Sequence, residues 1–106
     1  MPKYLVQASY SPQGWQGVMR EKASGRSNAV KKLVESLEGR VESVYFTFGD
    51  HDVVIIAELP DSVTAAALAI TVSASGLVHA KTTPLLSVEE IDRALEKKIN
   101  YRPPGG

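Results

Sequence analysis

The chain contains no cysteine among its 106 residues. Disulfide bonds, thiolate nucleophiles and metal sites with cysteine ligands are therefore excluded. It also contains only two histidines, His51 and His79. A zinc site would need both of them and a carboxylate from a distant part of the chain. We therefore expect no metal site, and we expect no cofactor.

A net charge is also absent, because Lys+Arg and Asp+Glu number 12 each. No overall field attracts the protein to nucleic acid or to an anionic membrane. The sequence has no phosphate-binding Gly-x-x-x-x-Gly-Lys motif, no Gly-x-Ser-x-Gly elbow and no aromatic RNA-binding pattern. It begins without a basic segment followed by an apolar run, and no apolar run is long enough to span a bilayer. We expect a cytoplasmic protein with neither nucleic acid nor a membrane as partner.

What is present is an ordinary globular composition, with 43% hydrophobic and 23% charged residues. The length predicts one domain, over residues 1–98, with a modest core that a second copy would help to stabilise. Residues 99–106 end in two prolines and two glycines, so we expect a flexible tail there.

Hydrophobic periodicity predicts four strands, at residues 3–10, 41–48, 53–59 and 77–86. A helix is predicted to start at Ser11-Pro12, to break at residues 24–28 and to end at Gly39 in a left-handed conformation. A second helix is predicted to start at Asp61 or Ser62 and to stop at Gly76. Ser87 and Glu90 have the capping-box spacing for a last helix that runs to about Lys98.

The order β-α-β-β-α-β is that of the α+β, ferredoxin-like fold, here with an extra C-terminal helix. Right-handed crossovers put the two main helices on one face of a four-stranded antiparallel sheet, with the strands in the spatial order four, one, three, two. The apolar third strand then lies in the centre, and the fourth strand, which contains Pro84, lies at an edge.

The other face of this sheet is predicted to be mixed in polarity. Residues alternate between faces along a strand, so Gln7 and Ser9, Tyr45, and His79 and Lys81 fall on the side without helices, next to apolar residues of the third strand. That face is too apolar in its middle to suit water alone. We expect a second copy of the chain to cover it, in a homodimer or a larger homo-oligomer.

The triplet Asp50-His51-Asp52 follows Gly49 and precedes the apolar third strand. In an extended segment the two carboxylates point to one side and the histidine to the other, so one metal could not bind all three without a sharp bend. Gly-Asp is also common turn chemistry. A turn and a functional site both stay open as interpretations.

His79 and Lys81 lie two residues apart on the fourth strand. Histidine suits proton transfer and lysine holds an anion, so together with Tyr45 and Gln7 they could form a polar pocket for a small acidic or phenolic ligand. The alternative is a solvated edge strand. Tyr10 and Trp15 could wall the mouth of a pocket, or serve as core or interface residues. The candidate ligand-binding residues are Gln7, Ser9, Tyr45, His51, His79 and Lys81.

Several segments resemble the GYD domain family, over the chain up to about Leu86. They are Lys3 to Tyr10, Leu33 to Arg40, Ala74-Ser75-Gly76 and the central Tyr45-Phe46-Thr47-Phe48-Gly49-Asp50-His51-Asp52. The sequence departs from the family at His51, where the resemblance would place a tyrosine. The family is similar to the dimeric α/β-barrel group, whose members include cofactor-independent monooxygenases, decomposition enzymes and ligand-sensing modules.

Three functions follow as hypotheses. The first is a module that binds a small organic ligand between sheet and helices, or mediates an interaction. The second, which the resemblance implies, is a cofactor-free monooxygenase-like enzyme, in which His79 or His51 moves a proton and Lys81 or Gln7 stabilises charge on the substrate. The third is a purely structural oligomer.

Overall fold

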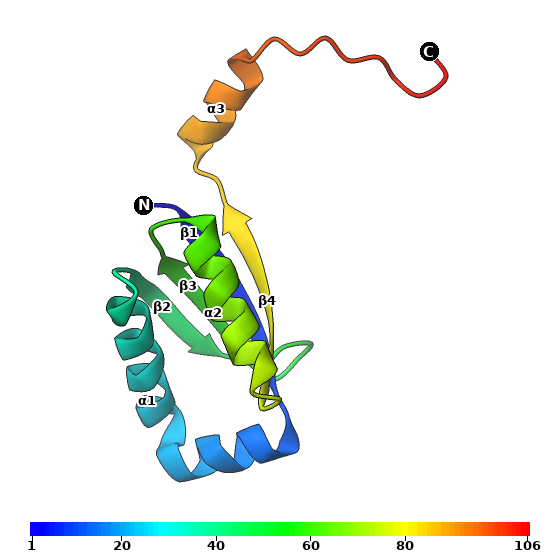
Figure 1. The fold of residues 1–106 in the computed structure, drawn as a ribbon. Coiled ribbons are helices and arrows are strands. Elements are labelled where there is room, and N and C mark those ends of the chain that lie inside the picture. Colours follow the sequence, from blue (N-terminus) through cyan, green and yellow to red (C-terminus); the bar gives the residue numbers. More distant parts are fainter.

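The computed structural model describes residues 1–106 and contains four strands and three helices. They follow in the order β1 (Lys3–Tyr10), α1 (Pro12–Ser36), β2 (Arg40–Phe46), β3 (Val53–Glu58), α2 (Ser62–Ala74), β4 (Val78–Leu85) and α3 (Val88–Glu96). Helices α1 and α2 cover one face of the sheet, and α3 projects beyond its end (Figure 1). The predicted α+β, ferredoxin-like architecture with an extra C-terminal helix is confirmed.

The sheet is antiparallel, with the spatial order β2-β3-β1-β4. The predicted strand order is therefore correct, and Pro84 lies on an edge strand, where its missing N–H leaves no gap in a central ladder. The register between β2 and β3 shifts between Val41 and Ser43, which marks a β-bulge.

The hydrophobic core is one layer between the sheet and the helices. Alternate residues of the central strands point into it, and Tyr4, Ala8, Val53 and Ala57 are each less than 5% exposed. The remaining residues of β3 are half-buried on the other side of the sheet. The apolar third strand, which was predicted to lie in the centre, contributes three residues to the buried core, Val53, Ile55 and Ala57, more than any other element.

Helix α1 contains a corner at Lys22, which has φ 65° and ψ 166°. Its first segment runs under the end of the sheet, and its second segment turns to run beside β2 (Figure 1). The predicted break at residues 24–28 is wrong by a few residues, because Gly25 is helical and a lysine makes the turn. Side chains rarely adopt this backbone conformation, which costs about 1–3 kcal/mol, so surrounding packing must impose it.

Helix α1 ends in a Schellman motif, in which the Gly39 N–H donates to the Val34 carbonyl at 2.9 Å and the Glu38 N–H to the Glu35 carbonyl at 3.0 Å. The left-handed residue is Glu38, with φ 63°, so the prediction for Gly39 is wrong by one position. Gly39 is needed for a different reason. A Cβ there would lie 2.9 Å from the Leu59 side chain and closer still to a β3 carbonyl oxygen.

The two later helices begin as predicted. Asp61 caps α2 by accepting the Thr64 N–H at 2.8 Å, and Gly76 follows that helix with φ 74°. Ser87 and Glu90 form both hydrogen bonds of a capping box at the start of α3. None of the helices is long and apolar enough to cross a membrane.

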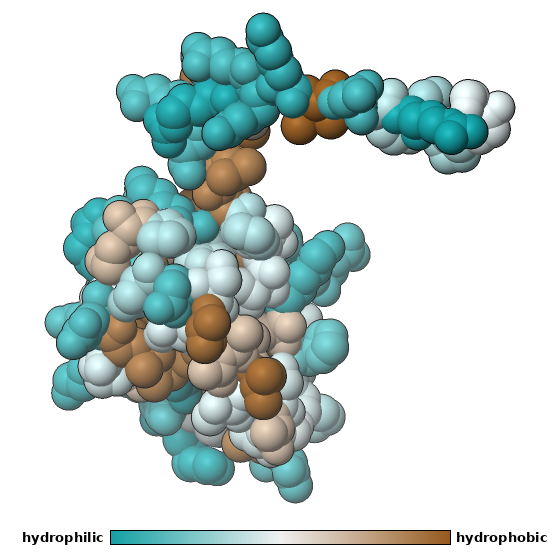
Figure 2. All heavy atoms as spheres, turned by 45° about the horizontal axis from the view of Figure 1, so that its top comes forward, coloured by the Kyte–Doolittle hydropathy of each residue, from teal (hydrophilic) through white to brown (hydrophobic).

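The arm, which we define as residues 86–106, stands clear of the body (Figures 1 and 2). No residue of α3 is buried, and the chain after Glu96 contains neither helix nor strand. Val88, Ile91 and Leu95 recur at helical spacing and are 80%, 42% and 77% exposed. Within the chain this apolar stripe stays largely exposed to water.

Candidate functional site

An apolar cleft of about 490 Å³ opens between α1, α2 and the face of the sheet that the helices cover. Its floor is formed by strand residues, among them Val6, Ala8, Ile55 and Ala80. One wall comes from α1 and the other from α2. Wall residues include Val18, Val30, Val34, Leu68, Ala69 and Val72. Apolar surface shows between the polar residues on this side of the body (Figure 2).

Small side chains keep this space open. Gly17 lines the cleft on α1, and Ala65 and Ala69 line it on α2. Helix α2 is rich in alanine, which allows its backbone to approach the sheet closely. Ala65 does pack against it and is 5% exposed, whereas Ala69 is half-buried at the cleft.

The charged side chains that line the cleft gather where α1 turns its corner. Arg20 and Glu21 precede Lys22, and Arg26 follows it by about one helical turn. The Arg26 Nη1 lies 3.5 Å from the Glu21 Oε2, and both side chains are partly exposed. We call Tyr10, Arg20, Glu21 and Arg26 the polar edge of the cleft.

Tyr10 joins the polar edge to the floor. Its ring packs edge-on against Trp15, with the ring centroids 5.1 Å apart. Burial raises the pKa of Tyr10, while the positive charge of Arg26 acts in the opposite direction. The phenol is therefore a neutral donor near pH 7. The hydrogen bond of Tyr10 to Asp52 uses the backbone N–H, and the hydroxyl has no protein partner.

Five of the six predicted ligand-binding residues lie together on the opposite face of the sheet. We call this the open face: Lys3, Leu5, Gln7, Ser9, Val54, Ile56, Glu58 and the residues paired with them on β2 and β4. The register aligns Tyr45, Val54, Gln7 and Lys81 in one row across all four strands, and Ser9 pairs with His79. None of the five lines the cleft. Their contact with a ligand, and the enzymatic role of His79 and Lys81, stay predictions.

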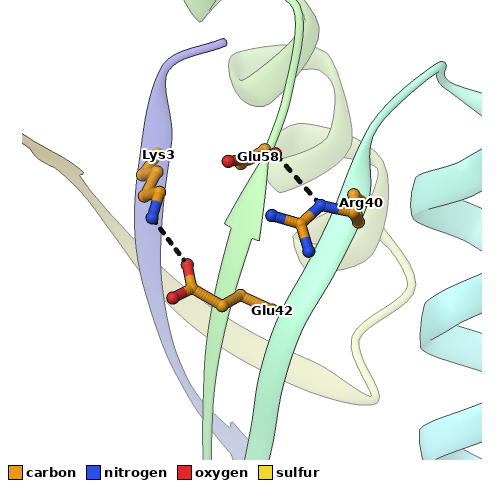
Figure 3. Close-up of polar contacts among 4 residues, drawn as sticks. All are labelled: Lys3, Arg40, Glu42 and Glu58. Carbon is orange, nitrogen blue, oxygen red and sulfur yellow. Dashed lines mark hydrogen bonds and ion pairs between the residues drawn. The ribbon is translucent and has the colours of Figure 1, made fainter.

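One end of the open face carries two ion pairs, which sequence reasoning missed. Lys3 Nζ lies 3.0 Å from Glu42 Oε2, and Arg40 Nε lies 3.2 Å from Glu58 Oε2 (Figure 3). The hydrogen bond from Arg40 is the main reason why the pKa of the Glu58 carboxyl is lowered. Simple alternation along β2 would place Arg40 and Glu42 on the face of Val44, under the helices. The β-bulge between Val41 and Ser43 reverses this and opposes Arg40 to Glu58, so the pairs could not be inferred from alternation alone. Exposed pairs of this kind contribute little stability.

The sixth residue, His51, lies in the loop between β2 and β3 and is half-buried. Its neighbour Asp52 fixes this loop to the end of β1. The Asp52 carboxylate accepts the Tyr10 N–H at 2.8 Å, and the Asp52 N–H donates to the Ala8 carbonyl at 2.8 Å. Asp52 therefore has a structural role in the turn. The structure brings together no three histidine, cysteine or carboxylate residues that could hold a metal ion.

Sequence reasoning gave the mouth of a pocket as one of two interpretations of Tyr10, beside a core or interface role, and missed the two arginines of the polar edge. No local pattern marks them, because Arg26 reaches the cleft only through the corner at Lys22. The residue with positive φ at this corner is a lysine and not a glycine, so the sequence gives no signal of a turn there.

In a comparison with protein families, the model of the GYD domain matches residues 4–95, which include all four strands apart from Lys3 and all of the arm helix α3 apart from Glu96. Comparisons with curated proteins and with solved structures find no significant match. The chain, whose Tyr45-to-Asp52 segment forms the end of β2 and the loop that Asp52 fixes, belongs to the GYD domain family.

Proposed function

We propose that this protein binds a small organic molecule in the cleft between α1, α2 and the sheet. The cleft itself carries the proposal: about 490 Å³ of space with mainly apolar walls and one polar edge. Pockets for small ligands have volumes of about 300–1,000 Å³ and this combination of apolar walls with few polar groups.

Apolar walls favour an apolar occupant. Each Å² of apolar surface removed from water contributes about 25 cal/mol, so a ligand that covers the floor and both walls gains affinity from area alone. Interiors of folded proteins are otherwise close-packed. A cleft of this size beside the core is therefore unusual unless a molecule fills it.

The test is a binding measurement with a matched pair of variants on one helix. Ala69 lines the cleft, whereas Ala66 faces outward on α2 and is exposed. Ala69→Trp should fill the cleft and weaken binding of the neutral fluorescent probe N-phenyl-1-naphthylamine by at least about tenfold. Ala66→Trp should leave its binding unchanged. Equal affinity in both variants and in the wild type would show that the probe binds elsewhere, and the proposal would fail.

We also propose self-association through the open face, as a homodimer or a larger homo-oligomer. Leu5, Val54 and Ile56 occupy the middle of that face, and Tyr45 beside them is 69% exposed. The arm adds a second apolar surface that the chain does not cover. Asp92 and Glu96 lie beside the apolar stripe of the arm. Lys81 on the open face forms no ion pair within the chain, so it can pair with these carboxylates on the arm of a second copy.

Sedimentation velocity at micromolar concentration tests this second proposal. Val54→Glu places a charge in the middle of the open face and should yield monomers. Val63→Glu, on the outer surface of α2 where the valine is 79% exposed, is the matched control and should sediment like the wild type. A wild-type protein that is strictly monomeric at this concentration would contradict the proposal.

A further inference from the structure

We infer that the ligand of the cleft is an amphiphile with an apolar body and one anionic group, which Arg26 and the Tyr10 hydroxyl bind at the polar edge. This inference rests on the proposed function and adds the chemical class of the ligand. An aromatic or aliphatic carboxylate is the simplest molecule of this class.

The distribution of charge around the cleft supports an anion. Floor and walls are mainly apolar, with Gln13, Ser75 and Thr82 as uncharged polar residues. Among the lining residues of the polar edge, two guanidinium groups stand against the single carboxylate of Glu21, and the Asp52 carboxylate, which does not line the cleft, also acts on the Tyr10 phenol. A cationic ligand would face repulsion from both arginines. For an anionic ligand the excess positive charge lies at one end of the cleft only. The ligand would therefore bind with its anionic group at the polar edge and its apolar body over the floor.

Arg26 has free capacity for such a group. Its Nη1 lies 3.5 Å from the Glu21 carboxylate, which is too long for a strong hydrogen bond, and the two side chains are 33% and 45% exposed. An exposed pair of this kind contributes little. The guanidinium has five N–H donors in a planar arrangement that fits a carboxylate or a phosphate. An incoming anion can therefore replace Glu21 at low cost.

Tyr10 supplies the second donor. Its hydroxyl has no protein partner and shares the cleft with Arg26, whose charge acts on its titration. Because burial raises the pKa of Tyr10, the hydroxyl keeps its proton near pH 7 and can donate to an anionic oxygen. A neutral donor and a cation at one edge both favour a negatively charged acceptor over a neutral one.

The strained corner of α1 brings these groups together. Lys22, with φ 65° and ψ 166°, separates Arg20 and Glu21 from Arg26 and turns the helix so that all three line the cleft. A straight helix would carry Arg26 past the end of the sheet. Backbone strain of about 1–3 kcal/mol persists where the surroundings over-determine it, and such strain clusters at sites that hold ligands.

The experiment compares two probes that differ in one group, 2-naphthoate and 2-naphthalenemethanol, by isothermal titration calorimetry. We expect the wild type to bind the carboxylate about tenfold more tightly than the alcohol. Arg26→Met should weaken binding of the carboxylate by about five- to tenfold and change binding of the alcohol by less than about twofold. Tyr10→Phe should weaken binding of the carboxylate alone by a few-fold. Lys32→Met, an exposed cation of α1 that does not line the cleft, is the control and should change neither.

The outcomes separate the inference from the proposed function. If both probes bind equally, Ala69→Trp weakens both and Arg26→Met changes neither, the cleft binds small molecules without preference for an anion and the inference is refuted. If neither probe binds, or if Ala69→Trp has no effect on either, the proposed function fails together with the inference. Far-UV circular dichroism of each variant confirms that a lost affinity does not reflect a lost fold.

Discussion

Replacing Asp52 by alanine tests whether the Asp50-His51-Asp52 triplet is first of all a turn. The Asp52 carboxylate accepts the Tyr10 N–H at 2.8 Å and so fixes the β2–β3 loop to the end of β1. A hydrogen bond to a charged group contributes about 1.5–3 kcal/mol, and a buried donor left without a partner costs about 1–3 kcal/mol. Both residues are half-buried, so water can reach the N–H in part. We therefore expect Asp52→Ala to lower the free energy of unfolding by about 2 kcal/mol.

The assay is urea unfolding followed by far-UV circular dichroism, at one fixed protein concentration because self-association would add to the measured stability. Asp50→Ala is the matched control, since the Asp50 carboxylate accepts no hydrogen bond and is exposed. It should change the unfolding free energy by less than about 0.5 kcal/mol. Asp52→Asn keeps an acceptor oxygen and should fall between the two. If Asp52→Ala is no more destabilising than Asp50→Ala, the loop is held by something other than this carboxylate and the structural interpretation is refuted.

The remaining predictions concern the backbone and one titration. Lys22→Gly should stabilise the protein by about 1 kcal/mol, because glycine relieves the strained corner. Lys31→Gly, in a regular part of α1, should destabilise it by about 1 kcal/mol. Equal losses of stability in urea unfolding would mean that the corner is not strained. Gly39→Ala should cost at least about 2 kcal/mol because its methyl group meets the Leu59 side chain, and Gly49→Ala, where a Cβ meets nothing within 4 Å, should cost almost nothing. The pKa of Glu90 is lowered mainly by a backbone N–H at the start of α3, so its contribution to that helix is present above the ordinary glutamate pKa and is lost as the pH falls through the lowered value. Circular dichroism should show a loss of helix in acid that Glu90→Gln does not show, and identical acid titrations would contradict the role of the capping box.

Much of the fold follows from local patterns in the sequence. The continuous apolar run from Val53 predicts a central strand covered on both faces, because successive residues of a strand point to opposite faces and here nearly all of them are apolar. Ser87 and Glu90 predict the start of α3, because a capping box satisfies two backbone N–H groups with nearby side chains. Each of these signals involves interactions among residues close in the chain.

The errors arise where distant contacts decide the backbone. Lys22 turns the corner of α1 although Gly25 lies three residues further on, and Glu38 adopts the left-handed conformation next to Gly39. In the second case the Glu58 carbonyl and the Leu59 side chain lie so close to residue 39 that only glycine, which has no Cβ, fits there. Residue propensities alone cannot predict which residue adopts the positive φ at such a position, because tertiary packing decides it.

A ligand site between sheet and helices was one of the sequence hypotheses, but the residues that line the cleft could not be predicted, for the same reason. The alternation along the strands correctly grouped Gln7, Tyr45 and Lys81 on one face, because side-chain direction in a strand is a local property. The space between α1 and α2 depends on how two helices diverge over the other face. Polar residues attracted attention to the open face, while the cleft is made mainly of residues that look like ordinary core.

Chemical-shift mapping by NMR tests the central claim most directly, because it locates a bound molecule on one side of the sheet or the other. A titration of methyl-labelled protein with 2-naphthoate should shift the side-chain methyl signals of cleft residues such as Val30, Leu68 and Val78 and leave those of Leu5, Val54 and Ile56 on the open face unchanged. Shifts that gather at Leu5, Val54 and Ile56 instead would place the ligand on the open face and contradict the account.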